Sequence, residues 1–269
     1  MYSKASNMEQ EMIQFRTKEL YADLYKNKGK PLVVIIGGSS AGIWAHIDTS
    51  FMNYLTANYN VLVFAYFGVE GLPKYLKKVP LEYFINGINQ IKDILMLKDT
   101  EITFIGNSKG AEATLLIVSK YFSRCNTVAC VPSCYVWQGI TKSAKDFFSV
   151  KSSWTYQNKE LPFIKLRFDS ETIRDLINKS YCSSYEKGIK HYMNAKTIID
   201  LSNFKGRLLL LSAEQDNYWP SKLMCEKIAN NFKIDVIHKV LNLREHYFQE
   251  YEEPINETIK FLEATSIKI

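Results

Sequence analysis

The sequence lacks several features that mark other classes of protein. No apolar run approaches the roughly 18 residues that a membrane-spanning helix requires, and the polar N-terminus, soon followed by acidic residues, is unlike a signal peptide. The net charge of +6 is spread along the chain, with one adjacent lysine pair, Lys77-Lys78, and no basic stripe interleaved with aromatic residues. These absences predict a cytoplasmic protein without a membrane span and without a nucleic-acid partner.

Cysteine and histidine are scarce as well. The five cysteines form an odd set without the paired spacing of a zinc site. Cys125 and Cys130 flank a predicted buried strand, so we expect free thiols in the core. Nothing in the sequence indicates a bound metal or prosthetic group. Only four histidines are present, which leaves few candidates for a catalytic base.

Apolar runs and helical stretches alternate along most of the chain. With 269 residues and 46% hydrophobic content, one large core can form, and we expect a single domain over residues 1–269. The alternation is typical of an α/β fold, a mostly parallel central sheet with helices on both faces. Ahead of it, residues 12–16 and 20–25 alternate apolar and polar side chains, which predicts a small antiparallel hairpin. The predicted core strands are Leu32–Ile36, Val61–Tyr66, Ile102–Ile105, Thr127–Val131, Arg207–Leu211 and Asp235–Val240.

The most informative motif is GNSKG at residues 106–110. A short β-branched run leads into this Gly-x-Ser-x-Gly pattern, and a helix-compatible segment, Ala111 to Tyr121, follows it. A serine on such a sharp strand-to-helix turn needs small neighbours, and its hydroxyl lies beside the free N–H groups of a helix N-terminus. We therefore interpret Ser108 as a nucleophile; a turn serine that caps the following helix is the alternative.

Two later loops offer partners for Ser108. In α/β-hydrolases the order along the chain is serine, then an acid, then histidine, each after a strand. Asp216 follows the predicted strand Arg207–Leu211 and is our candidate acid, with Glu214 and Glu245 as alternatives. His246 is the one histidine that follows Asp216 in a loop, and this order favours it as the base.

The first predicted core strand ends in a loop of small residues, beginning Gly37-Gly38-Ser39-Ser40. Backbone N–H groups in such a loop can approach a substrate oxygen closely, so we interpret it as the oxyanion loop. The two expected donors are the N–H groups of Lys109 and of Ser39, with Ser40 as the alternative. A phosphate-binding loop is excluded by the spacing, because neither Gly-Lys-Ser/Thr nor Gly-x-Gly-x-x-Gly is present.

The side chain of Lys109 allows two interpretations. Glu112 lies one helical turn further along, which predicts an ion pair between the two residues. A role of Lys109 in steering an anionic substrate is the alternative.

Several segments share their order and composition with one known family. These segments are Gly37–Ser40, Ala65–Gly68, Gly71–Lys74, Leu81–Phe84, Gly106–Glu112, Ser153–Tyr156 with Leu161-Pro162, and Asp216–Ser221. Together they resemble the C-terminal, catalytic α/β-hydrolase domain of the acyl-CoA thioesterase and bile acid-CoA:amino acid N-acyltransferase family. The resemblance implies an α/β-hydrolase fold with a cap insertion and a substrate that carries coenzyme A, with no separate cofactor.

The chain also departs from the family pattern. The family nucleophile is serine in the thioesterases and cysteine in the bile-acid transferase, so Ser108 favours hydrolysis. The glycine expected just before the histidine is absent ahead of His246, and Gln215 replaces an acidic residue before the aspartate. Mammalian members carry an N-terminal β-sandwich domain, for which the roughly thirty residues before the first core strand are too few.

The interval from about Ser133 to Asn203 interrupts the alternation of strands and helices. It is long, aromatic and polar, and it lies where this fold inserts a cap. We interpret residues 133–203 as a partly helical lid that supplies the acyl pocket; an irregular loop with a small core of its own is the alternative.

These observations predict a serine hydrolase of acyl-thioesters. It would work through a Ser-His-Asp triad and an acyl-enzyme on Ser108. The alternatives are an acyl-CoA:amino acid N-acyltransferase, a carboxylesterase, and a hydrolase-fold protein that only binds a ligand. The expected partner is a small-molecule thioester or ester, and the sequence indicates no oligomeric state.

Overall fold

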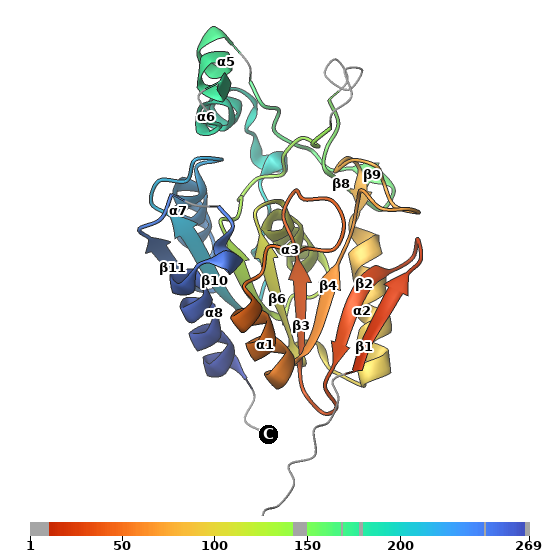
Figure 1. Cartoon of the computed structure of the whole chain (residues 1–269). Coiled ribbons are helices and arrows are strands. Elements are labelled where there is room, and N and C mark those ends of the chain that lie inside the picture. The colour runs from red at the N-terminus through yellow and green to blue at the C-terminus, as the bar shows by residue number, and fades with distance from the viewer. Residues whose placement is uncertain (1–10, 142–149, 168, 178–179, 245, 267–269) are drawn as a thin grey trace, which may run out of the picture.

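An eight-stranded sheet forms the centre of the molecule (Figure 1). The strand order is β1-β2-β4-β3-β6-β7-β10-β11, parallel from β4 to β11, with β1 and β2 antiparallel to their neighbours. The strands are β1 (Glu11–Arg16), β2 (Tyr21–Lys26), β3 (Leu32–Ile36), β4 (Asn60–Phe64), β6 (Ile102–Asn107), β7 (Asn126–Cys130), β10 (Arg207–Ala213) and β11 (Asp235–Leu241). The structure is a computed structural model that describes residues 11–141, 150–167, 169–177, 180–244 and 246–266.

All six predicted core strands are confirmed, with bounds displaced by two residues at most. The N-terminal hairpin is confirmed too, since Ile13 pairs antiparallel with Leu24. Strands β3 and β4 are buried along their whole length, because helices cover both of their faces. Strand β11 lies at the edge of the sheet and is exposed at alternate positions, which explains its mixed apolar and polar sequence.

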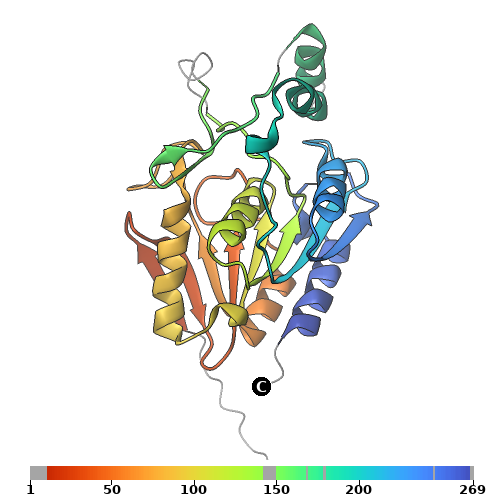
Figure 2. The same ribbon diagram turned by 180° about the vertical axis from the view of Figure 1, so that it is seen from behind.

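Helices cover both faces of the sheet. Helices α1 and α8 lie on the face seen in Figure 1, and α2, α3 and α7 lie on the face seen in Figure 2. A hydrophobic core lies between the sheet and the helices on each face. Val33 and Ile35 of β3 belong to the core beneath α1 and α8. Val34 and Ile36 belong to the core beneath α2, α3 and α7, as the alternation of side chains along a strand requires. The helices are α1 (Thr49–Asn58), α2 (Leu81–Leu95), α3 (Lys109–Lys120), α7 (Ser221–Asn231) and α8 (Glu252–Thr265), with short 3₁₀ helices η1 (Asp99–Glu101), η2 (Ala195–Thr197) and η3 (Phe248–Glu250).

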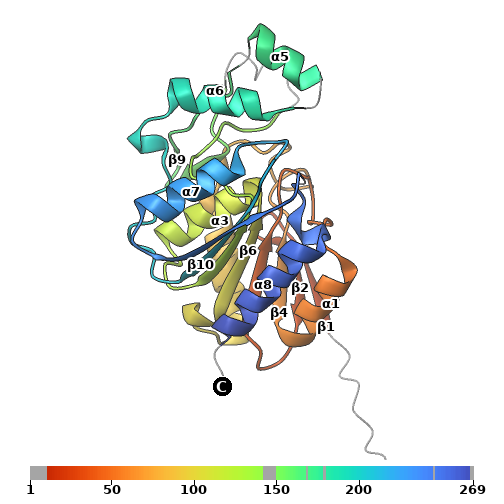
Figure 3. The same ribbon diagram turned by 90° about the vertical axis from the view of Figure 1, so that its left-hand side faces the viewer.

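Between β7 and β10 the chain leaves the sheet and passes above the carboxyl ends of the strands (Figure 3). This region, the cap segment (residues 133–203), is partly helical, as expected, although residues 142–149 lie outside the described part. It contains β8 (Trp154–Tyr156), β9 (Lys159–Glu160), α5 (Ser170–Ile177) and α6 (Cys182–Tyr192). A small three-stranded sheet of order β5-β8-β9 joins it to β5 (Val79–Pro80) of the main body.

Among the described residues, no helix combines the length and the apolar character needed to cross a membrane.

Candidate active site

Ser108 lies on a sharp turn between β6 and α3. Its backbone has φ 54° and ψ −120°, a conformation that side-chain-bearing residues rarely adopt and that recurs at functional turns. Glycine is required on both sides of it. A Cβ at Gly110 would lie 2.1 Å from the carbonyl oxygen of Gly37, and a Cβ at Gly106 would lie 2.6 Å from Cα of Ala111. The GNSKG motif therefore forms the strained strand-to-helix turn that its sequence predicts.

The structure brings the three predicted triad residues together. Nε2 of His246 lies 2.7 Å from Oγ of Ser108, and Nδ1 of His246 lies 3.0 and 3.1 Å from the two carboxylate oxygens of Asp216. All three residues are buried, with exposed fractions of 7% for Ser108, 5% for His246 and 9% for Asp216. The geometry is that of a nucleophile, a base and an orienting acid. The catalytic roles of the three residues stay a prediction.

Neighbouring groups hold the carboxylate and the imidazole in place. Oδ1 of Asp216 accepts hydrogen bonds from the backbone N–H groups of Tyr218 at 2.9 Å and Trp219 at 3.4 Å. The Tyr218 ring stacks on the His246 imidazole with centroids 4.7 Å apart, and the Trp219 ring approaches it by its edge. The side-chain amide of Asn107 donates to the carbonyl oxygen of His246 at 3.2 Å. These contacts restrict the imidazole to one orientation.

The competing candidates lie in other environments. Nδ1 of His46 is 2.7 Å from a carboxylate oxygen of Glu250, and His238 lies within β11 and contacts a serine hydroxyl of β10. Glu214 forms a 2.6 Å ion pair with a lysine of α7 instead of facing an imidazole. Glu245 lies outside the described residues. Asp216 is thus the better-placed of the two described candidate acids.

The predicted oxyanion loop lies against Ser108. A Cβ at Gly38 would lie 3.4 Å from Cβ of Ser108. Ser39 lines the same cavity as Ser108 and Lys109, whereas Ser40 is not part of its lining. Within the described residues, the backbone N–H groups of Ser39 and Lys109 donate to no protein acceptor. Both N–H groups are therefore available as donors, and the cavity lining favours Ser39 over Ser40; their oxyanion role stays a prediction.

Tyr66 supports this loop, a contact that the sequence reasoning missed. Its hydroxyl lies 2.9 Å from the carbonyl oxygen of Gly37 and 2.5 Å from that of Gly38. Burial raises the pKa of Tyr66 far above its ordinary value of 10.0, so the hydroxyl keeps its proton and acts as a donor. The family-like segment Ala65–Gly68 contained this tyrosine but no signal for its role.

A cavity of about 320 Å³ opens beside Ser108, and we call it the Ser108 cavity. Its size lies in the range of small-molecule sites. The cap segment contributes Ile140, Leu166, Tyr181 and Tyr185 to its wall, and its role as a lid over an acyl pocket stays a prediction. The main body contributes further aromatic side chains, namely Trp44, Tyr218, Trp219 and Tyr247. The lining is thus largely apolar around the Ser108 hydroxyl.

The predicted ion pair between Lys109 and Glu112 is confirmed. Nζ of Lys109 lies 2.5 Å from Oε2 of Glu112, and both side chains are buried. Burial lowers the pKa of Lys109 and raises that of Glu112, and each charge opposes the shift of the other. The other oxygen, Oε1, accepts hydrogen bonds from the backbone N–H of Trp137 at 2.9 Å and from Nε1 of Trp154 at 2.8 Å. Sequence reasoning missed these two contacts to the cap segment.

All five cysteines are free, and Cys125 and Cys130 are buried as expected. Within the part of the chain that the structure describes, no three His, Cys, Asp or Glu side chains form a group that could hold a metal ion.

The mostly parallel sheet with helices on both faces and the strained serine turn define the α/β-hydrolase fold, as predicted. Solved structures share this fold. The esterase Pf2001 of Pyrococcus furiosus superposes with a TM-score of 0.59 at 17% identity, over 95% of this chain and 92% of that one. Carboxylesterase CesB of Bacillus subtilis superposes with a TM-score of 0.56 at 10% identity, over 97% and 94%. At such identities the likeness shows the fold alone.

Sequence comparison then identifies the family. The profile of the family described as "BAAT / Acyl-CoA thioester hydrolase C terminal" matches residues 79–243, more than half of the chain. The protein belongs to this family, which confirms the resemblance seen in its motifs. The matched range contains Ser108 and Asp216, and His246 follows just beyond it.

Curated relatives are distant in sequence. Acyl-coenzyme A thioesterase 6 of Mus musculus is 24% identical over 225 residues, covering 81% of this chain and 49% of that protein. Acyl-coenzyme A amino acid N-acyltransferase 2 of Rattus norvegicus is 23% identical over 223 residues, covering 82% and 49%. The chain thus spans about half the length of these two relatives.

Proposed function

We propose that this protein hydrolyses acyl-thioesters by way of an acyl-enzyme on Ser108. The observation that carries the proposal is the continuous hydrogen-bonded arrangement Ser108–His246–Asp216 on a strained turn, within a chain of this family. A serine hydroxyl is a weak nucleophile unless a base accepts its proton, and His246 lies at the distance needed for that transfer. No separate cofactor is required, because coenzyme A would arrive as part of the substrate.

The reaction would run in two halves. Oγ of Ser108 attacks the thioester carbonyl carbon while Nε2 of His246 takes the hydroxyl proton, and Asp216 stabilises the resulting imidazolium. The N–H groups of Lys109 and Ser39 would hold the negative oxygen of the tetrahedral intermediate. Collapse breaks the carbon–sulfur bond, and the thiol leaves with the proton from His246. Water, activated by the same imidazole, then attacks the ester and releases the carboxylic acid.

Transfer to an amine is the second candidate. Two curated relatives are named as acyl-coenzyme A amino acid N-acyltransferases. In that reaction the amino group of an acceptor would replace water in the second half, and the product would be an amide. The presence of serine at position 108 is the reason to place hydrolysis first.

The decisive experiment measures thiol release from acyl-CoAs of short to long chains, with and without glycine or taurine. The wild-type protein is compared with Ser108→Ala and with the control Ser202→Ala, which changes an exposed serine outside the lining of the Ser108 cavity. If the protein is a hydrolase, the wild type and Ser202→Ala should release thiol, Ser108→Ala should not, and the second product should be the free acid. An amide product that depends on the amino acid would establish transfer instead.

Labelling with a fluorophosphonate tests whether Ser108 is a reactive nucleophile, independently of which substrate the protein accepts. Stoichiometric labelling that Ser108→Ala abolishes would demonstrate a reactive nucleophile, even if no acyl-CoA is hydrolysed; that pair of results would favour an ester substrate. A wild-type protein that neither labels nor releases thiol would contradict the proposal and favour a binding protein with this fold.

A further inference from the structure

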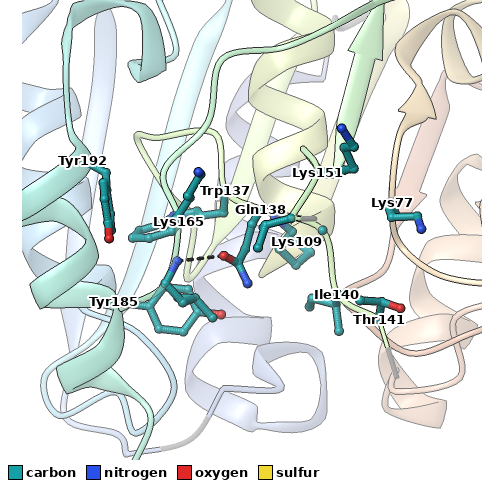
Figure 4. A pocket seen from close by; sticks show the side chains of 13 residues that line it. Lys77, Lys109, Trp137, Gln138, Ile140, Thr141, Lys151, Lys165, Tyr185 and Tyr192 are labelled. Carbon is teal, nitrogen blue, oxygen red and sulfur yellow. Dashed lines mark hydrogen bonds between the residues drawn. The ribbon is translucent and has the colours of Figure 1, made fainter. Parts of the chain in front are cut away.

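A second cavity, of about 340 Å³, borders the Ser108 cavity. The two share four lining residues, Lys109, Ile140, Leu166 and Tyr185. Figure 4 shows the side chains around this second cavity, which we call the lysine cavity. A ligand that reaches from one cavity into the other would pass these shared residues. The lysine cavity is therefore in position to hold a distant part of a molecule whose reactive end lies at Ser108.

Lysine is the prevailing charged residue in this cavity. Lys77, Lys151 and Lys165 come from three separate stretches of the chain and surround it (Figure 4). No Asp or Glu side chain of the described residues lines the cavity. Lys151 and Lys165 form no ion pair within the described part of the chain. Positive charge in a concave site with low-polarity walls attracts anions more strongly than the same charge on a convex surface.

Lys109 behaves differently from the other lysines. Its ammonium group is buried and is paired with Glu112, so it adds no net charge to the cavity. The charge available to a ligand therefore comes from the more exposed lysines, in particular Lys151 and Lys165. This geometry speaks against the earlier alternative in which Lys109 itself steers the substrate.

The wall between the two cavities suits a neutral linker. Ile140 and Tyr185, which line both cavities, provide apolar surface there, and Trp137 continues it within the lysine cavity. The side-chain oxygen of Gln138 accepts a 2.9 Å hydrogen bond from the backbone N–H of Leu166, which leaves its amide NH₂ group as a donor (Figure 4). A carbonyl group in the linker of a ligand could accept from that donor. The pattern along the two cavities is thus a reactive serine, a neutral passage and an anion-binding end.

We propose that the lysine cavity binds the phosphoryl groups of the thiol carrier of the substrate, as found in coenzyme A, with Lys151 and Lys165 as the main contacts. Lysine ammonium groups bind phosphates through charge-assisted hydrogen bonds. The proposal rests on the proposed function of Ser108, since it assigns the carrier end of the same substrate. According to this proposal, the two lysines make the protein select a thioester with a phosphorylated carrier over a thioester whose carrier has no phosphate.

The test uses the charge-reversed variant Lys151→Glu/Lys165→Glu and two substrates with the same acyl group. One substrate is an acyl-CoA, and the other is the thioester of N-acetylcysteamine, which has no phosphate. The expected result is a rise in KM for the acyl-CoA of about tenfold or more, with kcat little changed. The kcat/KM for the N-acetylcysteamine thioester should stay the same, and the difference between the substrates should shrink at high salt.

The matched control is Lys28→Glu/Lys30→Glu, which reverses the same charge at exposed positions in the turn between β2 and β3, away from the cap segment. It should leave KM for both substrates unchanged. Equal losses on both substrates in the Lys151→Glu/Lys165→Glu variant would overturn the proposal, because they would mean damage to the fold or to the chemistry. An unchanged KM for acyl-CoA would overturn it as well.

A binding measurement separates this proposal from the proposed function. Calorimetric titration of the Ser108→Ala protein with coenzyme A and with pantetheine, which lacks phosphates, requires no turnover. The proposal predicts binding of coenzyme A that weakens when Lys151→Glu/Lys165→Glu is added, and much weaker binding of pantetheine. Equal affinities for the two ligands would contradict it, whether or not the wild-type protein hydrolyses thioesters.

Discussion

Nε1 of Trp154, in the cap segment, donates a 2.8 Å hydrogen bond to Oε1 of Glu112, on the helix that follows Ser108. The same oxygen accepts from the backbone N–H of Trp137, also in the cap segment, and the other oxygen receives the Lys109 ammonium. One buried carboxylate therefore joins two points of the cap segment to the first turn of α3. Since Lys109 directly follows Ser108, the position of the cap segment is coupled to that of Ser108, the predicted nucleophile.

Glu112→Gln tests this junction. The substitution would leave the Lys109 ammonium buried without an opposite charge, so we expect the free energy of unfolding to fall by about 3–5 kcal/mol. Trp154→Phe removes one hydrogen bond to Glu112 and part of a fully buried ring, and should cost about 2–5 kcal/mol. Urea denaturation followed by fluorescence and circular dichroism measures both. The double variant Lys109→Met/Glu112→Gln should be more stable than Glu112→Gln, because no unpaired charge is left. A Glu112→Gln protein as stable as the wild type would contradict this account.

Tyr66→Phe tests the support of the oxyanion loop. Loss of the hydroxyl leaves the carbonyl oxygens of Gly37 and Gly38 without their donor, so the loop should hold the Ser39 N–H less precisely. We expect kcat to fall about tenfold, less than the loss of an oxyanion donor itself, with KM nearly unchanged. Steady-state kinetics on a thioester or an activated ester provides the measurement.

The matched control for Tyr66→Phe is Tyr83→Phe. Tyr83 also donates to a backbone carbonyl, that of Ala65 at 2.7 Å, and the other partners of its hydroxyl are backbone groups of Tyr21, outside the loop. Its loss should lower thermal stability without a selective effect on kcat. Equal changes in kcat for the two variants would show that the Tyr66 hydroxyl has no particular role in the site.

The strands and the serine turn could be predicted because their signals are local. Continuous apolar runs mark buried strands, and two glycines around a serine mark a turn that admits no side chain there. The order Ser108, Asp216, His246 predicted that the three residues lie close together, since parallel strands bring the loops that follow them to one edge of the sheet. The structure brings these three residues together at that edge.

The supporting contacts could not be predicted in the same way. Trp154 lies 42 residues from Glu112, and Tyr66 lies 29 residues from Gly37, so no periodic pattern links them. Their side chains meet because of how the cap segment and the loops pack. The lysine cavity was missed for the same reason: its lysines are far apart in the sequence, and charge runs reveal neighbours along the chain only.

Asp216→Asn tests the candidate acid. In the variant only the amide oxygen can accept from the Nδ1–H of His246. When the NH₂ group faces the ring, it donates to Nδ1 instead, and this favours the tautomer that carries its proton on Nε2 and cannot accept from Ser108. We expect kcat to fall by about 10³–10⁴-fold while the fold is retained. Glu214→Gln, at the alternative acid, should leave kcat unchanged because Glu214 faces a lysine. Thiol-release kinetics on both variants decides between them, and a larger loss in Glu214→Gln would reverse the assignment.

His238 provides a pH-dependent contribution to stability. Its Nε2 lies 2.8 Å from Oγ of Ser212. Burial disfavours the charged imidazolium and lowers the pKa of His238 below its ordinary value of 6.5. The unfolded chain therefore takes up a proton near pH 6.5 that the folded chain resists. The stabilising contribution is present above that pH and is lost as the pH falls toward the folded-state pKa.

His238→Gln removes this titration and keeps a polar side chain opposite Ser212. The wild-type protein should lose more stability than the variant when the pH is lowered from about 7.5 to about 5. Urea denaturation at several pH values in this interval measures the difference, and other titrating groups cancel because both proteins share them. A variant that loses stability as steeply as the wild type would mean that His238 titrates alike in the folded and unfolded chains.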